Sequence, residues 1–545
     1  MSRKRKKGYP ETTAPSVSAG CIAWVVLILV MIFTGLVRYR LLDVPLERDE
    51  GEYAYAGQLI LQGIPPYQEV YNMKLPGIYA AYAVILAVFD QTHQGIHTGL
   101  LVINGITIVL VFLLAKRLLN ASAAVISAAA FAVFSVGAGV HGISANAEHF
   151  VILFALAGLL VMLRALDKNR LWGLFVAGVL LGISFTMKQH GLAFSAVVML
   201  YLILDAVFQK PIPWRKLMKM ELSFAAGIIA VVVCLCLMMI WLGVFKNFWF
   251  WTVDYARTYL SQRSFQAGYK EFIEIFSFIL KSSPLLWMMS GLGIICLASG
   301  KITKSKKTFL LLYAVFSFLS ICPGLYFRHH YFVLLLPCAA LLAGTAGYVL
   351  SLGVLRLTKV SPLIPAALAI ACTAQALYQQ REFLFQLTPF EACRFLYGAN
   401  PFAESLEIAS YIREHTDPND TITILGSEPQ ICFYAHRRSA SRYIYMYPLM
   451  ENHPFSLQMQ KDFIRETEAK KPKYLVFVNV PFSWLRSSDS HNLLFEWFGR
   501  YQKNFRPAGT IELYDDRTIY HWPPQVKWPV SSKEWIAVFE RTTDR

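Results

Sequence analysis

The chain has 545 residues, of which 56% are apolar and 16% are charged, and its mean hydropathy is +0.44. This composition excludes a water-soluble globular protein and a disordered chain, and it predicts a polytopic membrane protein. The net charge of +16 does not indicate nucleic-acid binding, because much of the surplus falls in short loops between apolar runs. Such placement is typical of the cytoplasmic loops of membrane proteins. We therefore expect contact with membrane lipid and no nucleic-acid partner.

The chain starts with a basic segment at 3–7, which is followed by a long apolar run over 21–37. This run has the length of a membrane helix, and no small-residue cleavage site of a signal peptide follows it. We expect residues 1–20 to be a basic cytoplasmic N-terminus and the run to be an uncleaved first span.

About ten further apolar runs follow, and each approaches the roughly 20 residues that cross a bilayer. They lie at approximately 95–116, 121–141, 148–166, 170–187, 190–208, 222–245, 284–299, 308–323, 331–353 and 361–379. Residues 78–89 are apolar but short, and we expect them to lie at the membrane interface. The sequence thus predicts an α-helical polytopic membrane domain over 21–380 with about eleven transmembrane helices.

The charges between these runs predict the orientation. With the N-terminus inside, five loops rich in lysine or arginine face the cytoplasm. They contain Lys116 and Arg117; Lys168 and Arg170; Lys210, Arg215, Lys216 and Lys219; Lys301, Lys304, Lys306 and Lys307; and Arg356 and Lys359. Carboxylates, histidines and amides collect instead in the outer loops, at 41–94, 141–149, 187–191, 246–283 and 323–331. We therefore expect the chemistry on the outer face.

Residues 381–545 read as an extracytoplasmic soluble α/β domain. Residues 404–415 have helical periodicity, and 458–471 also read as a helix. We expect buried strands at 421–426 and 473–480, a hairpin at 510–522 around Asp515 and Asp516, and a final strand at 535–541. The domain contains no glycine-rich phosphate loop, so no chemistry is assigned to it.

The cysteines show neither metal nor redox spacing. Most of them fall in or at apolar runs, where cysteine behaves as a small hydrophobic residue. Cys393 and Cys432 lie beyond the last span, and their spacing gives only weak support for a disulfide. We expect neither to be essential to the fold.

The first outer loop carries the strongest functional signal. Between residues 47 and 79 it holds the carboxylates and cations Glu47, Asp49, Glu50, Glu52, Glu69, Arg48 and Lys74. Glycines and prolines punctuate it, which predicts short helices joined by turns. Ionisable groups beside a membrane usually have a partner, a water-filled cavity or a substrate. We interpret this loop as half of an active site.

Asp49 and Glu50 are candidate catalytic carboxylates. An aspartate just outside the first span is placed to accept a proton from an acceptor hydroxyl or amine, which is the role of a general base. A second interpretation stays open: Asp49 is chemically a good helix N-cap, with Glu52 in the capping-box position. The two roles are compatible.

Two cations of the outer face are candidates for binding the phosphate of a donor. Lys74 precedes a Pro-Gly turn, and its ammonium can hold a phosphate or extend to lipid headgroups. Arg328 suits bidentate phosphate contact. The adjacent His329, His330 and Tyr331 are candidate substrate-binding residues, although a loop of this kind can simply cap helix ends.

The remaining candidates lie in two short outer segments. Lys188 is outside against the positive-inside bias, so it joins the phosphate-binding candidates, with Gln189 and His190 as substrate-binding candidates. Glu148 begins an apolar run and is a third candidate catalytic carboxylate, although it also suits the dipole at a helix N-terminus. No cofactor and no metal ligand are assigned. A divalent metal stays open, but the spacing is not diagnostic for the residues considered, Glu69, His149, His329 and His330.

These motifs resemble a known family. RDEGEYAYAGQLILQG at 48–63 and YQEVYNMKLPGIYAAYA at 67–83 are similar to the first outer loop of membrane glycosyltransferases of the GT-C fold. The likeness is to the branch of protein O-mannosyltransferases (dolichyl-phosphate-mannose-protein mannosyltransferase-like) and aminoarabinose transferases. ANAEHF at 145–150, FTMKQHG at 185–191 and FRHHYFVLLLPCAALLAG at 327–344 match in the same order.

The resemblance implies an inverting glycosyltransferase whose donor is a sugar on a polyprenyl phosphate, used from the extracytoplasmic side of a membrane such as the bacterial inner membrane. It implies that Asp49 is the base and Glu148 a second acidic position. It places Lys74 and Arg328 near the lipid phosphate. An Asn-Met pair precedes Lys74 where the family motif has an acidic residue or aromatics, which removes support for a metal site carried over from the aminoarabinose branch. The acceptor (glycan, lipid or protein) stays open.

Two other function classes compete with this interpretation. A polyprenyl-lipid or small-solute transporter or flippase without transferase activity usually has ionisable groups near mid-membrane and often repeat symmetry, whereas these spans are almost free of charge and no repeat appears. A receptor or assembly scaffold would leave the outer-loop carboxylates unexplained. The sequence therefore favours a hexosyltransferase, with the resemblance carrying most of that preference.

Overall fold

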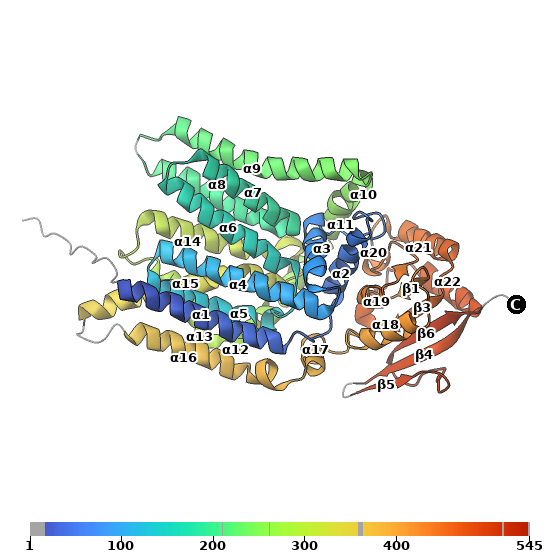
Figure 1. Cartoon of the computed structure of the whole chain (residues 1–545). Helices are drawn as coiled ribbons and strands as arrows, with labels where there is room; N and C mark the ends of the chain where they lie inside the picture. The colour runs from blue at the N-terminus through green and yellow to red at the C-terminus, as the bar shows by residue number, and fades with distance from the viewer. Residues whose placement is uncertain (1–16, 210, 261, 358–362, 515–516, 543–545) are drawn as a thin grey trace, which may run out of the picture.

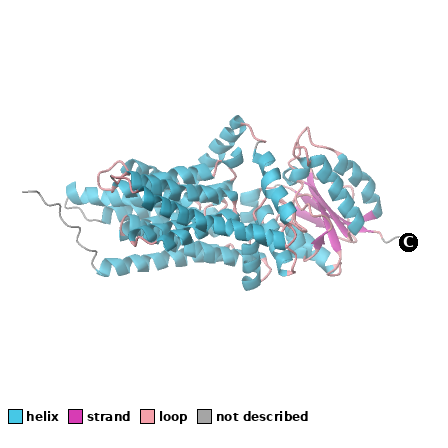
Figure 2. Ribbon diagram, turned by 90° about the horizontal axis from the view of Figure 1, so that it is seen from above, coloured by secondary structure: helices cyan, strands magenta, loops and turns pink. Residues whose placement is uncertain are grey.

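The structure of the chain, a computed structural model, describes residues 17–542 except 210, 261, 358–362 and 515–516. Long helices run side by side in one bundle, and a smaller part that contains a sheet lies at one end of it (Figure 1). The view in Figure 2 shows the strands gathered in that smaller part. This architecture confirms the predicted fold class of a helical membrane protein with a small C-terminal α/β part.

Each apolar run that was predicted as a span forms a helix, since backbone groups inside a bilayer must be hydrogen-bonded within their own segment. The helices are α1 (Val17–Arg40), α4 (His93–Leu118), α5 (Ala121–Ser135), α6 (Ala147–Asp167), α7 (Leu171–Met187), α8 (Leu192–Val207), α9 (Trp214–Trp241), α13 (Pro284–Cys296), α14 (Lys304–Ser320), α15 (Leu336–Leu357) and α16 (Leu363–Gln379). Local caps help to set their starts. The side chains of Thr92 and Asn120 accept hydrogen bonds from the third residues of α4 and α5.

By length and composition, fewer than eleven of the described helices qualify as candidate membrane spans. Within the described residues, six helices are long and apolar enough to cross a membrane, or seven if the bent pair α12 (Phe265–Ser282) and α13 is one span. Shorter apolar helices are α3 (Pro76–Phe89), α5 and α7. The chain is thus an integral membrane protein, and the count of eleven spans stays a prediction. Residues 3–7, Lys210 and Lys359, used in the orientation argument, lie outside the described residues.

The outer segment at 246–283, expected to be a loop, is mostly helical. It contains α10 (Phe245–Trp249), the π-helical η3 (Phe250–Tyr255), α11 (Ala256–Leu260) and α12. One face of α12 is apolar, with Phe272 and Phe276 packed against Phe332, while Lys270 and Glu274 are exposed. The helix meets α13 at 106°. An amphipathic helix of this kind carries too many polar residues to be recognised as a span.

The C-terminal part folds much as the sequence predicts, with a mixed six-stranded sheet of order β2-β1-β3-β6-β4-β5. The strands are β1 (Thr421–Leu425), β2 (Arg438–Ser439), β3 (Tyr474–Asn479), β4 (Phe505–Leu513), β5 (Thr518–His521) and β6 (Glu534–Arg541), and the helices are α17 (Pro389–Tyr397), α18 (Glu404–Glu414), α19 (Gln430–Ala435), α20 (Tyr447–Met450), α21 (Ser456–Lys470) and α22 (Leu493–Tyr501). β3 pairs in parallel with β1, Ile422 opposite Tyr474, and antiparallel with β6. This central strand is buried on both faces, which explains its continuous apolar sequence. Asp515 and Asp516, in the predicted hairpin turn, lie outside the described residues.

The cysteines form no disulfide in the described chain. Cys393 and Cys432 are both buried and free. The disulfide considered between them is therefore absent, and packing holds this part of the chain together.

The C-terminal part packs directly on the first outer loop. Helix α2 (Arg48–Leu61) lies against α19, and a Cβ on Gly51 would come within 2.6 Å of the Cβ of Gln430. Only glycine permits so close an approach of the two helices. The Tyr434 hydroxyl accepts a hydrogen bond from the Leu46 amide at 2.8 Å, just ahead of α2. The first outer loop therefore lies between the bundle and the sheet (Figure 1).

Candidate active site

Glu47, not Asp49, caps the N-terminus of α2. The Glu47 side chain accepts a hydrogen bond from the Glu50 amide at 3.2 Å, and the Glu50 side chain accepts one from the Glu47 amide at 3.2 Å. This capping box overturns the alternative interpretation in which Asp49 is the cap and Glu52 its partner. The contacts of Asp49 and Glu52 therefore need another explanation.

Asp49 accepts hydrogen bonds from two distant segments. Its Oδ2 accepts one from the Lys74 ammonium at 2.8 Å, and its Oδ1 accepts one from the Tyr445 hydroxyl at 2.8 Å. The Tyr53 hydroxyl lies 3.4 Å from Asp49 Oδ2 and 3.2 Å from Lys74 Nζ. The side chains of Asp49 and Lys74 are 18% and 15% exposed, so a ligand in the adjoining cavity can reach both.

The two charges of this pair shift each other's ionisation. Burial alone would raise the pKa of Asp49, but the Lys74 ammonium together with His330 and Lys188 outweighs burial and holds that pKa well below its usual value. Burial alone would lower the pKa of Lys74, but the carboxylates of Asp49 and Glu52 raise it. Both members of the pair are charged at neutral pH. Asp49 is a weak proton acceptor for as long as Lys74 is bound to it.

Glu50 points into the protein. Its Oε1 accepts a hydrogen bond from the Ala145 amide at 2.5 Å and lies 3.0 Å from His97 Nε2. The residue is fully buried. It thus joins α2 to α4 and to the segment ahead of α6, and these contacts assign it a structural role. They give the predicted catalytic role no support.

Glu148 and Lys188, both predicted site residues, form an ion pair. The Lys188 ammonium donates to Glu148 Oε1 at 2.5 Å, and both side chains are buried. The same ammonium lies 4.0 Å from the centroid of the Tyr331 ring, and His330 Nε2 lies 4.0 Å from Glu148 Oε1. Glu148 Oε2 has no hydrogen-bond partner among the described residues. The phosphate-binding role predicted for Lys188 therefore competes with a strong internal contact.

Gln189 holds the segment that carries Lys74. Its Nε2 donates to the Met73 carbonyl at 3.0 Å. From the other side, the Tyr67 hydroxyl donates to the Lys74 carbonyl at 2.6 Å. The structure thus brings the turn at 187–191 to the first outer loop, where Gln189 contacts the backbone.

Arg328 is a cation without a carboxylate partner among the described residues. Its guanidinium lies 5.8 Å from the centroid of the Tyr326 ring, and its side chain lines the cavity described below. The preceding backbone is strained, because the φ angles of Leu325 and Phe327 are +56° and +44°. Such conformations cost energy in non-glycine residues and are concentrated at functional sites. An unpaired guanidinium in this position suits an anionic ligand.

One cavity of about 450 Å³ collects many of the predicted groups. Six of the predicted site residues line it: Asp49, Lys74, Arg328, His329, His330 and Tyr331. Its lining in the described chain does not include the other five, Glu50, Glu148, Lys188, Gln189 and His190. His329 is fixed there by a 2.8 Å contact to the Gly139 carbonyl and by stacking on His141 at 4.4 Å.

The C-terminal part forms one wall of this cavity. No chemistry had been assigned to this part from its sequence. Tyr445, Tyr447 and Glu451 line it, and Glu451 accepts a hydrogen bond from the Tyr255 hydroxyl at 2.6 Å. A signal was present in the tyrosine-rich stretch YIYMYP at 443–448. Aromatic rings with polar hydroxyls suit a ligand that has both apolar and polar surface.

The side chains considered for a metal site do not assemble one. In the described part of the chain, no group of three or more His, Cys, Asp or Glu side chains is placed to hold a metal ion. Glu69 lies 3.8 Å from Arg438 and His329 contacts a backbone carbonyl. The side chains that the structure describes therefore do not assemble a divalent-metal site.

An apolar groove of about 620 Å³ begins beside the Lys74 segment. It is lined by α3, α4, α6, α7 and α9, and Pro76, Gly77, Thr186 and Met187 are among its lining residues. No charged side chain is among the lining residues of the described chain. Lys74 and Lys188 lie within two residues of these lining residues in the sequence. The groove therefore suits a hydrocarbon chain whose polar end lies at the candidate site.

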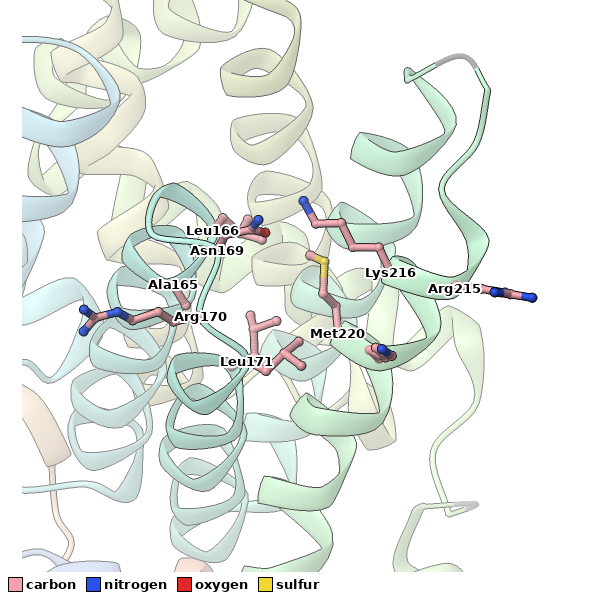
Figure 3. A pocket seen from close by; sticks show the side chains of 10 residues that line it. Ala165, Leu166, Asn169, Arg170, Leu171, Arg215, Lys216 and Met220 are labelled. Atoms are coloured by element: carbon pink, nitrogen blue, oxygen red, sulfur yellow. The ribbon is translucent and has the colours of Figure 1, made fainter.

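A further cavity, of about 390 Å³, lies between the α6–α7 turn and the start of α9. Lys216 extends across it toward Asn169, whereas Arg215 points away (Figure 3). None of the predicted site residues lines this cavity in the described chain. Its basic side chains come from loops that are predicted to be cytoplasmic.

Comparison with known proteins gives a family match over part of the sequence and a similar fold in solved structures. Residues 74–241 match the model of the family described as dolichyl-phosphate-mannose-protein mannosyltransferase. No curated protein sequence matches the chain.

Two solved structures share the architecture over nearly the whole chain. ArnT from Cupriavidus metallidurans bound to undecaprenyl phosphate is 15% identical with a TM-score of 0.55, and the match covers 94% of this chain and 98% of ArnT. The archaeal oligosaccharyltransferase AglB from Archaeoglobus fulgidus, in complex with an inhibitory peptide and a dolichol-phosphate, is 13% identical with a TM-score of 0.54, and the match covers 95% of this chain and 76% of AglB. At these identities the likeness establishes the fold.

Proposed function

We propose that this chain, which has the GT-C fold of membrane glycosyltransferases, is an inverting glycosyltransferase. Its residues 74–241 match the model of a mannosyltransferase family. It moves a sugar from a polyprenyl-phosphate donor to an acceptor on the extracytoplasmic face of the membrane. The acceptor is a glycan, a lipid or a protein.

One observation carries this proposal. A carboxylate, Asp49, and two cations, Lys74 and Arg328, line the same cavity, and an apolar groove begins beside Lys74. A binding site for a lipid phosphate needs cations at the phosphate and an apolar groove for the hydrocarbon chain, and sugar transfer needs one proton acceptor. Two neighbours in fold support a lipid-phosphate donor, since ArnT is bound to undecaprenyl phosphate and AglB to a dolichol-phosphate.

The reaction requires one displacement at the anomeric carbon. The acceptor oxygen or nitrogen forms a bond to this carbon while the bond from the carbon to the phosphate oxygen breaks, so that the configuration inverts. The electron pair of the broken bond leaves with polyprenyl phosphate, whose charge Lys74 and Arg328 stabilise. The proton of the acceptor passes to a carboxylate oxygen of Asp49.

Lys74 links donor binding to the basicity of Asp49. While the ammonium is bound to Asp49 at 2.8 Å, the pKa of this carboxyl is held low, mainly by Lys74 acting against burial. A donor phosphate offers the ammonium a second anion. When Lys74 moves toward the phosphate, Asp49 becomes a stronger proton acceptor in the step that needs one.

The surroundings of the site complete the proposal. The active site faces the periplasm or exterior of a bacterial inner (plasma) membrane, together with the soluble domain at 381–545. Residues 21–380 form the transferase domain and residues 1–20 stay cytoplasmic. The loop charges support this orientation.

Purified protein incubated with labelled polyprenyl-phosphate sugars and envelope extract tests the function. We expect label to move to an acceptor, with release of polyprenyl phosphate, and we expect Asp49→Asn protein to lack this transfer. Labelled lipid that crosses liposome membranes without loss of its sugar would instead support a flippase. Absence of transfer with every donor and extract offered would contradict the proposal.

A further inference from the structure

Glu52 is a buried carboxylate of the site that the proposed reaction does not use. It lies one turn after Asp49 on α2 and is fully buried. Its Oε2 accepts a hydrogen bond from Asn72 Nδ2 at 2.8 Å, and its Oε1 is hydrogen-bonded to the Tyr79 hydroxyl. Since the cap of α2 is Glu47, neither contact belongs to helix capping.

Asn72 connects Glu52 to the segment that carries Lys74. Its Oδ1 accepts a hydrogen bond from the Met73 amide at 2.7 Å, which orients the amide group so that Nδ2 faces Glu52. Two residues further on, the Lys74 ammonium contacts Asp49 at 2.8 Å. Two side chains of α2 thus contact the two ends of the stretch 72–74. Glu52 accepts a hydrogen bond from Asn72, and Asp49 accepts one from Lys74.

We propose that Glu52 is a positioning residue for the transfer: through Asn72 it holds the Lys74 segment on α2, so that the Lys74 ammonium is set between Asp49 and the donor phosphate. This inference rests on the proposed function. It assigns to Glu52 no contact with the donor or the acceptor.

The charge of Glu52 affects this arrangement. Burial raises the pKa of Glu52 to about 8, although Lys74 opposes the rise. The titratable groups that face it come from α2, the following loop, α3 and the C-terminal part, and they are Asp49, Tyr53, Tyr67, Lys74, Tyr79 and Tyr445. Below pH 8 the carboxyl is mainly neutral. As the pH rises through 8 it becomes an anion beside Lys74, competing with a donor phosphate for the ammonium and repelling the phosphate.

Binding of undecaprenyl phosphate to the full chain in detergent tests the positioning. We expect Glu52→Ala to weaken binding by about 10-fold or more, because the Lys74 segment loses its buried contact to α2. Glu52→Gln keeps the shape and can accept from Asn72 and donate to Tyr79, so we expect it to bind within about 2-fold of wild type. Glu404→Gln, a change at a buried carboxylate of the C-terminal part held by Arg394, is the matched control and should leave binding unchanged.

The pH dependence separates positioning from a merely structural role. If the neutral form is the competent one, wild-type affinity for undecaprenyl phosphate falls by about 10-fold between pH 7 and pH 9, in proportion to the neutral fraction. Glu52→Gln has no proton to lose, so its affinity should stay flat over this interval. A structural residue would give wild type and Glu52→Gln the same profile.

The outcomes distinguish this inference from the proposed function. If wild type binds undecaprenyl phosphate but Glu52→Ala binds it equally well, or if the profiles of wild type and Glu52→Gln are parallel, the inference is wrong and the function stands. If Glu52→Ala does not fold, the two pH profiles alone decide. If wild type itself fails to bind undecaprenyl phosphate, the function and the inference both fall.

Discussion

The hydroxyl of Tyr445 donates a 2.8 Å hydrogen bond to Asp49, a residue 396 positions earlier in the chain. Close by, Arg48 forms an ion pair of 2.8 Å with Glu428. The C-terminal part therefore touches the candidate base itself, and α2 is held from the bundle side and the sheet side together. A site built in this way depends on both parts of the protein.

Tyr445→Phe should lower kcat by about 10-fold and leave donor affinity unchanged. The substitution removes only the hydroxyl that holds Asp49 Oδ1, and a hydrogen bond to a charged group contributes roughly 1.5–3 kcal/mol. Steady-state transfer assays at saturating donor measure the effect. Tyr501→Phe, which removes a tyrosine hydroxyl elsewhere in the C-terminal part, is the control. Equal kcat for wild type and Tyr445→Phe would show that this part does not orient the base.

Asp49→Asn should lower turnover by about 100-fold or more, since general-base catalysis typically contributes 10²–10⁴. Asparagine keeps an oxygen for Tyr445 but lacks a basic carboxylate. Because Glu47 caps α2, the change leaves the cap intact and expression should be normal. Undecaprenyl phosphate should still bind, which separates chemistry from binding. Near-wild-type turnover in this variant would defeat the base assignment.

Lys74→Ala and Arg328→Ala should each weaken binding of undecaprenyl phosphate by about 10-fold or more, as expected when a charge-assisted bond to phosphate of roughly 1.5–3 kcal/mol is lost. Titration of the lipid into detergent-solubilised protein gives the affinities. Lys270→Ala removes an exposed cation on α12 and serves as the control. Wild-type affinity in both site variants would remove the phosphate assignment.

Single cysteines at Thr303 and Ser488 should be labelled from opposite sides of the membrane. Both positions are exposed; Thr303 precedes α14 in a lysine-rich loop, whereas Ser488 belongs to the C-terminal part. The positive-inside pattern places the first in the cytoplasm. A membrane-impermeant maleimide applied to intact cells and to inverted vesicles, in a background without other cysteines, reads the two sides. Labelling of both from one side would overturn the proposed orientation.

Much of the fold was predictable from local sequence. Runs of about twenty apolar residues form helices because an unpaired backbone group in a bilayer is costly. The continuous apolar run at 473–480 indicated the buried strand β3, and the helical periodicity at 404–415 indicated α18. The amphipathic α12 was missed because its polar residues break the apolar run. The sequence left Asp49 open as the N-cap of α2 because aspartate is a preferred cap residue, and only the backbone geometry selects Glu47.

The site divides in the same way. The sequence by itself determined that Asp49, Lys74 and Arg328 are charged residues beside apolar spans, where each requires a partner or a ligand. The tertiary structure decided which of the candidates satisfy one another: Lys188 is bound to Glu148 and Glu50 to His97, while Arg328 has no carboxylate partner in the described chain. It also brought Tyr445 to Asp49 and Asn72 to Glu52. Partner choice depends on contacts between segments up to hundreds of residues apart, and these follow from the packing of whole helices and the sheet, which no local pattern encodes.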